Sequence, residues 1–394
     1  GISAGWRISS EKFMRNVRAV DDLKLRVSYG TTGNQGFNTN TAYRMYSKDS
    51  WTYYNGQWMT VYGLMHNQNR DMKWEIKKEF DVGLDFSLFN RRLNGRMDYF
   101  SRKIEDAIYS GIPVASPPAV YATSTVNIGD ITNKGFEFEL NGRVVDTKDW
   151  TFDTSLVGSF VGKSRLEGMA KDTHMEFQAM PHGGGSAVRI FGGQEIGRYF
   201  LYRFAGVREE DGTPMIYSKD NKVIPYASGT DEDRVQTGNG LPKAVLSWNN
   251  TVRYRNWDLN LFFRSWLGQD VYNVTDMIQG VNCKITEGQN LLRTAYRRNK
   301  AITNTDRLML LDYWLEKGDF LKLDAVTLGY TLPRNKIKYV EKLRCYFTVR
   351  NVCTLTGYSG LDPEVNVNGL APGFEGMSQY PRTRSFILGI EIGF

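Results

Sequence analysis

Two short strings in the sequence match patterns that hydrolases use. Gly1-Ile2-Ser3-Ala4-Gly5 has the G-x-S-x-G spacing of a nucleophile elbow, in which a serine hydroxyl attacks a carbonyl carbon. That elbow needs a strand before it and a helix after it, and this string stands at the first residues of the sequence. His182-Gly183-Gly184-Gly185 matches an oxyanion loop, which in α/β-hydrolases precedes the nucleophile instead of following it. We therefore expect no catalytic residue and predict that the protein is not an enzyme.

Residues that could hold a metal ion are few and poorly spaced. The three histidines, His66, His174 and His182, fall in predicted loops without the spacing of zinc ligands. Two acidic stretches, Glu209-Glu210-Asp211-Gly212 and Asp231-Glu232-Asp233, lack the residue order of a calcium-binding loop and are interpreted as solvated loop tips. The sequence predicts no metal site and no cofactor.

The cysteines indicate a structural role. Cys345 and Cys353 are eight residues apart on one predicted strand, which separates them by roughly 26 Å, far beyond the reach of a disulfide. Cys283 lies in a long predicted loop with no obvious partner. An odd count without metal-ligand spacing favours three structural residues.

One predicted loop is unusually rich in tyrosine and tryptophan. Exposed aromatic side chains offer flat apolar faces with polar tips, which suit stacking on sugars or packing against a partner. We take these residues as candidates for contact with a substrate or a partner protein, and favour self-packing of the loop or a partner interface over direct ligand contact. The candidates are Tyr43, Tyr46, Trp51, Tyr53, Tyr54, Trp58 and Tyr62.

Composition excludes some partners without deciding the fold. The net charge of +7 comes from 50 basic and 43 acidic residues that are scattered, so no basic run predicts nucleic-acid binding. The charges are interpreted as solvated loops and turns near anionic lipid. No run approaches the ~18 apolar residues of a membrane helix.

The strongest pattern in the sequence is a two-residue alternation of apolar and polar positions. The last ten residues place apolar side chains at every second position, which predicts a strand with one apolar face. The same period indicates about eleven strands, at residues 1–8, 23–30, 80–88, 94–109, 136–140, 150–160, 246–254, 259–263, 321–325, 343–349 and 385–394.

Connections between these strands alternate between short and very long. The short ones are residues 9–22, 90–93, 146–149, 255–257 and 333–341, and the long ones are 33–73, 110–133, 164–242, 270–317 and 356–381. Outer-membrane barrels have short periplasmic turns and long extracellular loops, with lipid-facing and lumen-facing residues alternating along each strand. We therefore predict an all-β protein that spans a membrane with strands.

The order of the connections predicts that the first and last strands run in the same direction. Two such strands cannot close an antiparallel barrel, and an open sheet edge cannot sit in lipid. We expect residues 1–394 to be the C-terminal half of a larger barrel, and the isolated chain not to insert stably.

Several motifs resemble one family. Residues 314–323, WLEKGDFLKL, and 327–333, TLGYTLP, are similar to a strand of SusC/RagA-type TonB-dependent transporters. Arg350-Asn351-Val352, residues 356–364 (TGYSGLDPE) and the final strand ending at Phe394 also resemble that family, although Val352-Cys353 departs from its usual bulkier apolar pair. Further upstream, residues 23–30 and 133–137 fit the same order.

The resemblance implies the C-terminal portion, about eleven antiparallel strands, of a 22-stranded barrel in the outer membrane of a Gram-negative, Bacteroidota-like bacterium. The family's plug and TonB-box precede the barrel and are not in this chain. Implied partners are the N-terminal half of the barrel with its plug, the TonB complex, outer-membrane lipid, the barrel-assembly machinery and a SusD-like surface lipoprotein that acts as a lid. Transporter–lipoprotein pairs of this family often dimerise.

Three segments gain a role from the resemblance. Phe394 is expected to be an assembly signal, an interpretation favoured over an ordinary aromatic of the membrane interface. Residues 197–217 are expected to form a hairpin outside the membrane that could meet the lid, and the aromatic loop is expected to contact the substrate or the lid.

Active import of a large nutrient is the leading function, with a glycan or oligosaccharide favoured over an oligopeptide. A passive porin or a purely structural barrel is the first alternative, which the loop lengths and motifs disfavour. A soluble β-rich carbohydrate-binding or glycan-cleaving domain is the second, and it would need a pair of carboxylates in a cleft that the sequence does not single out.

Overall fold

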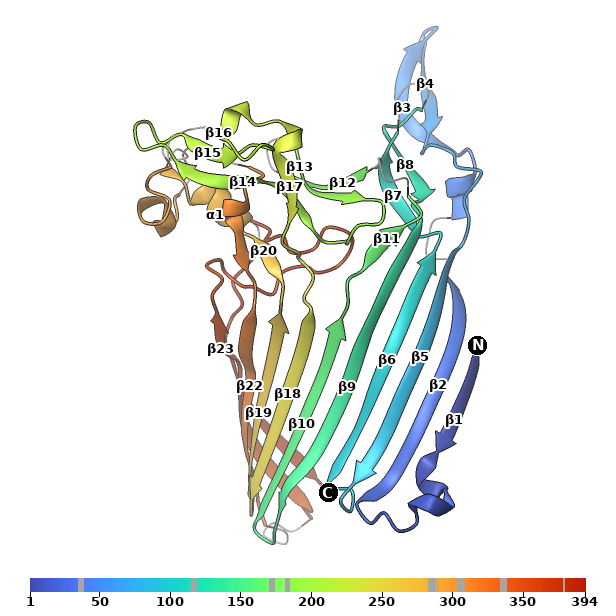
Figure 1. Ribbon diagram of the computed structural model, residues 1–394, viewed down its shortest axis with the longest axis vertical. Coiled ribbons are helices and arrows are strands. Elements are labelled where there is room, and N and C mark those ends of the chain that lie inside the picture. The colour runs from blue at the N-terminus through green and yellow to red at the C-terminus, as the bar shows by residue number, and fades with distance from the viewer. Residues whose placement is uncertain are drawn as a thin grey trace.

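Eleven strands form one continuous antiparallel meander in the computed structural model (Figure 1). The structure describes residues 1–34, 39–114, 119–169, 174–180, 185–282, 288, 290–302, 309–333, 339–377 and 380–394. In order across the sheet the strands are β1 (Ile2–Arg7), β2 (Val20–Asn34), β5 (Glu75–Leu88), β6 (Leu93–Glu105), β9 (Asp130–Asp146), β10 (Trp150–Val161), β18 (Ala244–Tyr254), β19 (Trp257–Leu267), β22 (Phe320–Thr331), β23 (Lys342–Thr356) and β24 (Ser385–Gly393).

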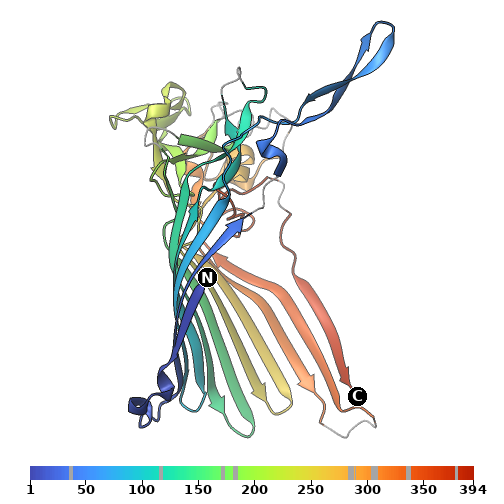
Figure 2. The same cartoon turned by 90° about the vertical axis from the view of Figure 1, so that its right-hand side faces the viewer.

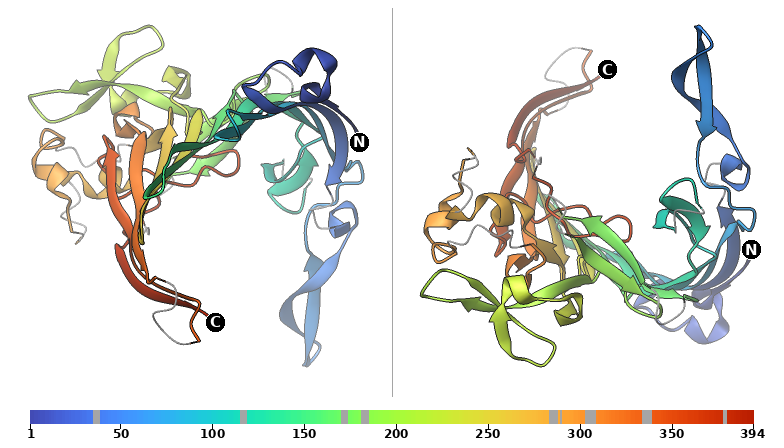
Figure 3. Two further views of the ribbon diagram at one scale, coloured as in Figure 1. Left: turned by 90° about the horizontal axis from the view of Figure 1, so that it is seen from below. Right: turned by 90° about the horizontal axis from the view of Figure 1, so that it is seen from above.

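The sheet curves into an open half-cylinder with β1 at one edge and β24 at the other (Figures 2 and 3). Each neighbouring pair along the meander is antiparallel, so the first and last of the eleven strands run in the same direction. The predicted strand count and parity are confirmed. Both edge strands have one hydrogen-bonded neighbour in the sheet, which leaves backbone N–H and C=O groups unpaired along their other sides.

Apolar and polar side chains separate onto the two faces of the sheet. In β24 the alternate residues Phe386, Leu388 and Ile390 are exposed on the outer, convex face. They pair directly with Val349, Phe347 and Cys345 of β23, and the rings of Phe347 and Phe386 stack with their centroids 6.3 Å apart. Cross-strand partners point to the same side of a sheet, so the pattern continues from strand to strand.

Short and long connections lie at opposite ends of the strands (Figure 1), called here the turn end and the loop end. At the turn end, residues 89–92 join β5 to β6, residues 147–149 join β9 to β10, and residues 255–256 join β18 to β19. Arg255 adopts a positive φ of 50° in the tightest of these turns. The predicted division into short and long connections is confirmed.

The long connections are folded rather than strandless. One group of strands above the sheet comprises β12 (His174–Ala179), β13 (Ser186–Phe191), β14 (Tyr199–Val207), β15 (Pro214–Tyr217), β16 (Val223–Pro225) and β17 (Arg234–Thr237). The shorter elements are β7 (Ile108–Pro113), β8 (Thr123–Asn127), β11 (Arg165–Glu167), β20 (Asp270–Tyr272), β21 (Leu315–Lys317) and helix α1 (Val274–Gln279). The predicted hairpin within residues 197–217 is present, since β14 pairs with β15.

These elements share a hydrophobic core at the loop end, which we call the head. Its fully buried side chains include Leu166, Val188, Tyr199, Tyr272 and Trp314. The same core also contains Ile128 and Phe374, so it draws on four different long connections. Among the described residues, no helix is long and apolar enough to cross a membrane.

Two expectations about individual segments were wrong. The strand predicted at residues 94–109 ends at Glu105, because Asp106 adopts a positive φ of 52° and the chain turns into β7. The aromatic loop is not strandless, since it forms the hairpin of β3 (Tyr46–Tyr54) and β4 (Gln57–Leu64).

Leu388 tests which face of the sheet meets lipid. In the full-length protein, Leu388→Arg should destabilise the folded barrel by about 2–4 kcal/mol, because a charge on the lipid face near mid-strand loses its hydration. Unfolding by urea in liposomes measures the difference. Ile387→Arg, on the opposite face of the same strand, is the control, and equal destabilisation by both variants would contradict the assignment of faces.

Candidate functional site

The strings that match hydrolase motifs do not form a catalytic arrangement in the part of the chain that the structure describes. Ser3 lies in β1 and pairs with Ser28 of β2, so it stands in an extended strand instead of on an elbow. His182 and its two following glycines lie outside the described residues. The ring of His66 lies 3.1 Å from the carbonyl oxygen of Asn40, a contact within a loop.

The described residues also contain no group of three histidine, cysteine or acidic side chains that could hold a metal ion. Cys345 and Cys353 both lie on β23 as free thiols, as expected from their spacing. Cys283 lies outside the described residues.

The inner, concave face of the wall carries cross-strand ion pairs. Arg26 of β2 binds Asp85 of β5 at 2.8 Å and Asp98 of β6 at 2.6 Å. Toward the other edge, Arg344 of β23 binds Asp258 of β19 at 2.6 Å. Alternation therefore places these charged side chains on the inner face of strands whose outer face is apolar.

Glycines allow two of these ion pairs to span three strands. Gly83 of β5 lies between Arg26 and Asp98, and a Cβ atom at Gly83 would overlap both side chains. Gly329 of β22 lies in the same way between Asp258 and Arg344, where a Cβ atom would lie 2.5 Å from the carboxylate and 2.6 Å from the guanidinium. A missing side chain on the middle strand thus lets each arginine reach the second strand along.

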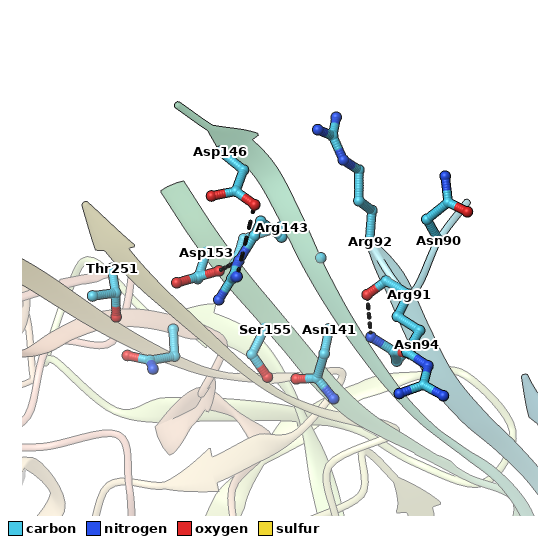
Figure 4. A pocket seen from close by; sticks show the side chains of 13 residues that line it. Asn90, Arg91, Arg92, Asn94, Asn141, Arg143, Asp146, Asp153, Ser155 and Thr251 are labelled. Carbon is cyan, nitrogen blue, oxygen red and sulfur yellow. Dashed lines mark hydrogen bonds and ion pairs between the residues drawn. The ribbon is translucent and has the colours of Figure 1, made fainter. Parts of the chain in front are cut away.

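The turn end of the inner face is a polar hollow (Figure 4). Arg143 lies there between Asp153, at 2.9 Å, and Asp146, at 3.8 Å. The other lining residues are Asn90, Arg91, Arg92, Asn94, Asn141, Gly142, Thr154, Ser155, Asn249 and Thr251. This composition fits a wall in contact with water or with another polar protein surface.

A buried charge cluster ties the last long connection to the wall. The Lys322 side chain of β22 is only 2% exposed, and its ammonium lies 2.8 Å from both Asp362 and Glu364 of that connection. Arg264 of β19 binds Glu364 at 2.9 Å, and Arg382 binds Asp362 at 2.8 Å. We call these five residues the charge lock.

The charge lock changes the acidity of one of its carboxyl groups. Burial acts to raise the pKa of Glu364, but hydrogen bonds from Arg264 and Lys322 outweigh burial and hold that pKa below its ordinary value. Glu364 is therefore ionised at neutral pH. A carboxyl group whose pKa is lower in the folded protein than in the unfolded chain stabilises the fold at pH values above the unfolded pKa. The ion pairs of Glu364 therefore stabilise the lock at neutral pH, and this stabilisation is lost in acid as Glu364 becomes protonated.

A second junction joins the head to the same connection. The Tyr199 hydroxyl lies 2.9 Å from the carbonyl oxygens of both Asp270 and Gly373. Glu316 accepts hydrogen bonds from the Ser359 backbone N–H, at 2.8 Å, and from the Ser359 hydroxyl, at 2.7 Å. Head, wall and last connection therefore form one packed assembly around the inner face at the loop end.

The seven aromatic candidates lie apart from this assembly, on or beside the β3–β4 hairpin. Their side chains are between 55% and 71% exposed, so they pack little against the described part of the chain. The base of the hairpin is held firmly, since Asn67 donates hydrogen bonds to the carbonyl oxygens of Tyr121, at 2.6 Å, and Thr123, at 2.9 Å. The structure gathers these residues on and beside one protrusion.

Sequence reasoning missed the charge lock, although three of its five residues, Lys322, Asp362 and Glu364, stand in the motifs at residues 314–323 and 356–364. A lysine at position 322, on the polar side of the alternation, and the acidic pair Asp362 and Glu364 are the only signals in the sequence. A pairing between segments forty residues apart is not readable from either motif alone.

Comparison with known proteins identifies relatives of the whole chain. A family model described as TonB dependent receptor-like, beta-barrel, matches residues 2–352. TonB-dependent receptor P3 of Formosa agariphila is 27% identical over 99% of this chain, and TonB-dependent receptor SusC of Bacteroides thetaiotaomicron is 26% identical over all of it. The chain spans 41% and 40% of the length of these two relatives.

A solved structure of the RagAB peptide transporter has a similar fold. It superposes with a TM-score of 0.84 at 20% sequence identity, covering 100% of this chain and 42% of the matched chain. Structures described as the closed-closed and open-open states of the RagAB peptide importer match with TM-scores of 0.81 and 0.77.

Lys322→Met tests the charge lock in the full-length protein. The variant leaves two partly buried carboxylates short of a cation, so we expect a loss of about 3 kcal/mol in the stability of the locked connection. Limited proteolysis within residues 357–377 measures the loss as faster cleavage.

Lys342→Met is the matched control for that experiment. It removes a lysine of the neighbouring strand from an ion pair with Glu391 in which both side chains are about half exposed, and such pairs contribute about 1 kcal/mol or less. Equal cleavage rates in the wild type and Lys322→Met would contradict a holding role for the lock.

Proposed function

This chain belongs to the TonB-dependent receptor-like β-barrel family, and we propose from that premise that it is the C-terminal half of an outer-membrane transporter that imports a large nutrient. The observation that carries the proposal is the half-cylinder wall, apolar outside and charged inside, which matches a family model over 351 residues from 2 to 352. In lipid, such a wall is stable only as part of a closed barrel.

Eleven further strands would complete a 22-stranded barrel. Because β1 and β24 run in the same direction, an odd number of strands must stand between them for every neighbouring pair to be antiparallel. Eleven is odd, and a chain that spans about 40% of its relatives leaves ample length for those strands and a plug. We place the TonB-box and the plug in that remaining length, and propose that the TonB complex couples import to energy.

A SusD-like surface lipoprotein is the proposed partner at the loop end, where the head and the β3–β4 hairpin would meet it as a lid. The matched RagAB importer has been described in closed-closed and open-open states, and a mouth that opens and closes in a similar way is part of our proposal. Doubling of transporter–lipoprotein pairs is part of the same proposal. We place the loop end outside the cell and the turn end in the periplasm.

We favour an oligosaccharide over an oligopeptide as the substrate. Seven exposed tyrosines and tryptophans on and beside one hairpin offer stacking faces, which supports the glycan alternative. The RagAB relative is described as a peptide importer, but its 20% identity speaks for the fold alone. A passive porin is disfavoured because a packed head with its own hydrophobic core stands above the wall.

Uptake in cells tests the proposal. Cells with the full-length gene should take up fluorescently labelled neutral oligosaccharides, and deletion of the TonB-box from that gene should reduce uptake at least ten-fold, because import against a gradient needs energy. Labelled oligopeptides of equal mass are measured in parallel. Uptake of peptides but not of oligosaccharides would show that the substrate is an oligopeptide. Uptake that the deletion does not reduce would indicate a passive pore.

Phe394 is proposed to act as the terminal residue of an assembly signal. It follows β24 and is 86% exposed, so it is accessible to the barrel-assembly machinery. Phe394→Ser in the full-length protein should lower the amount of heat-modifiable barrel in outer membranes several-fold. Phe386→Ser, which removes an exposed phenylalanine from within β24, is the control. Equal losses would make Phe394 an ordinary outward-facing aromatic residue.

A further inference from the structure

The β3–β4 hairpin presents five aromatic rings on a single face. Antiparallel partners point to the same side, and the register pairs Tyr53 with Trp58, Trp51 with Thr60 and Lys48 with Tyr62. Residues two apart on one strand also share a side, so all of these positions lie together. We call this the ribbon face, and its aromatic members are Tyr46, Trp51, Tyr53, Trp58 and Tyr62.

A β-bulge is what gathers the rings on that face. Tyr46 and Trp51 are five residues apart, a spacing that places side chains on opposite faces of a regular strand. The register shifts between Lys48 and Ser50, so Asp49 is the extra residue that restores the alignment. Gly63 makes room for it, since a Cβ atom there would lie 3.2 Å from the Cβ atom of Asp49.

The bulge also keeps negative charge off the ribbon face. Gly63 pairs with Ser47, so both lie on the opposite face, and the close approach of Asp49 to Gly63 places its carboxylate there as well. The ammonium of Lys48 lies 4.0 Å from the Trp51 ring centroid and is therefore occupied by a cation–π contact. The face has flat rings with polar tips and no carboxylate among its members.

Contacts within the hairpin hold three of the five rings, Trp51, Tyr53 and Trp58. Tyr53 and Trp58 meet edge to face with centroids 5.3 Å apart and an interplanar angle of 62°. At the base of the hairpin, the Tyr121 hydroxyl donates a hydrogen bond to the carbonyl oxygen of Leu64, and the Met65 N–H donates to Met45 at 3.0 Å. A surface that is already rigid loses little conformational entropy on binding.

The position and shape of the ribbon face favour a linear occupant at the mouth of the barrel. The hairpin leans over the open side of the half-cylinder and stays away from its convex, lipid-facing side (Figures 2 and 3). Nine residues of strand extend about 30 Å, whereas two paired strands are only about 5 Å apart. The ribbon face is therefore long and narrow, and its area is small compared with the roughly 800 Å² per partner that a stable protein interface buries.

We propose that the ribbon face binds a linear neutral glycan by stacking, with successive sugar rings lying along the aromatic side chains. One face of a pyranose presents C–H groups to a flat aromatic ring, and its edge hydroxyls reach the polar tips of tyrosine and tryptophan. The absence of a carboxylate and the engaged lysine favour a neutral chain. An extended peptide would instead pair with a free strand edge of the hairpin. The proposal rests on the proposed function only for placing this face outside the cell.

Binding of glycans to the purified full-length transporter tests the proposal. The probe is an array of linear neutral oligosaccharides of four to eight sugars with different linkages, and affinities for the bound members are then measured by calorimetry. We expect at least one member to bind, and replacing Trp51, Tyr53 and Trp58 together by alanine to weaken its binding at least ten-fold. Equal heat-modifiability of the wild type and the variant shows that folding is retained.

Tyr54→Ala is the matched control. Tyr54 is 71% exposed on the same hairpin, but its pairing with Gln57 places it on the opposite face, so binding should change less than two-fold. Binding of no array member by the wild type, or unchanged binding by the triple variant, would overturn the proposal. Loss of co-purifying lipoprotein from the triple variant with unchanged glycan binding would assign the face to the lid instead.

The same variants separate this inference from the import mechanism. Suppose that cells with the TonB-box deletion still bind the glycan and take it up as fast as the wild type. That result would contradict active import but would be consistent with glycan binding by the ribbon face. Suppose instead that the triple variant keeps full TonB-dependent uptake and the wild-type affinity for the glycan. That result would support active import and contradict glycan binding by the ribbon face.

Discussion

Backbone hydrogen bonding is the constraint on which the rest of this structure depends. In the hydrocarbon of a membrane, an unpaired N–H or C=O group costs several kcal/mol, so strands must find partners on both sides. An eleven-strand antiparallel meander satisfies every strand except β1 and β24, at its two edges. The need for further strands follows from that one requirement, and their number must be odd because the two edge strands run in the same direction.

Once the backbone is paired, side-chain alternation decides what each face can do. The outer face carries stacked aromatic residues, such as Phe138 with Phe160 and Trp248 with Phe263. The inner face uses the same two-residue period for ion pairs, and Gly83 shows that even the absence of a side chain has a role, since it lets Arg26 reach Asp98. Alternate residues of the same strands therefore provide apolar contact with lipid on one face and charged groups toward the lumen on the other.

The two-residue period made the wall predictable, because it is a local property that each strand displays alone. Strands such as Trp150–Val161 and Ala244–Tyr254 were expected nearly to their ends. The folded content of the long connections was not, since the hairpin of β3 and β4 contains a bulge at Asp49 that interrupts the alternation. The charge lock also escaped sequence reasoning, because Lys322 and Glu364 meet only after the wall and the last connection have folded together.

The two motifs at residues 314–323 and 356–364 contact each other in the folded chain. The motif at residues 314–323 supplies Glu316 and Lys322, and the motif at residues 356–364 supplies their partners Ser359, Asp362 and Glu364. These residues hold the last connection against the wall and the head. Surfaces that are free to contact other molecules must therefore be sought outside the motifs. Of the described residues, the exposed rings of the β3–β4 hairpin are such a surface, since packing against the rest of the chain does not account for them.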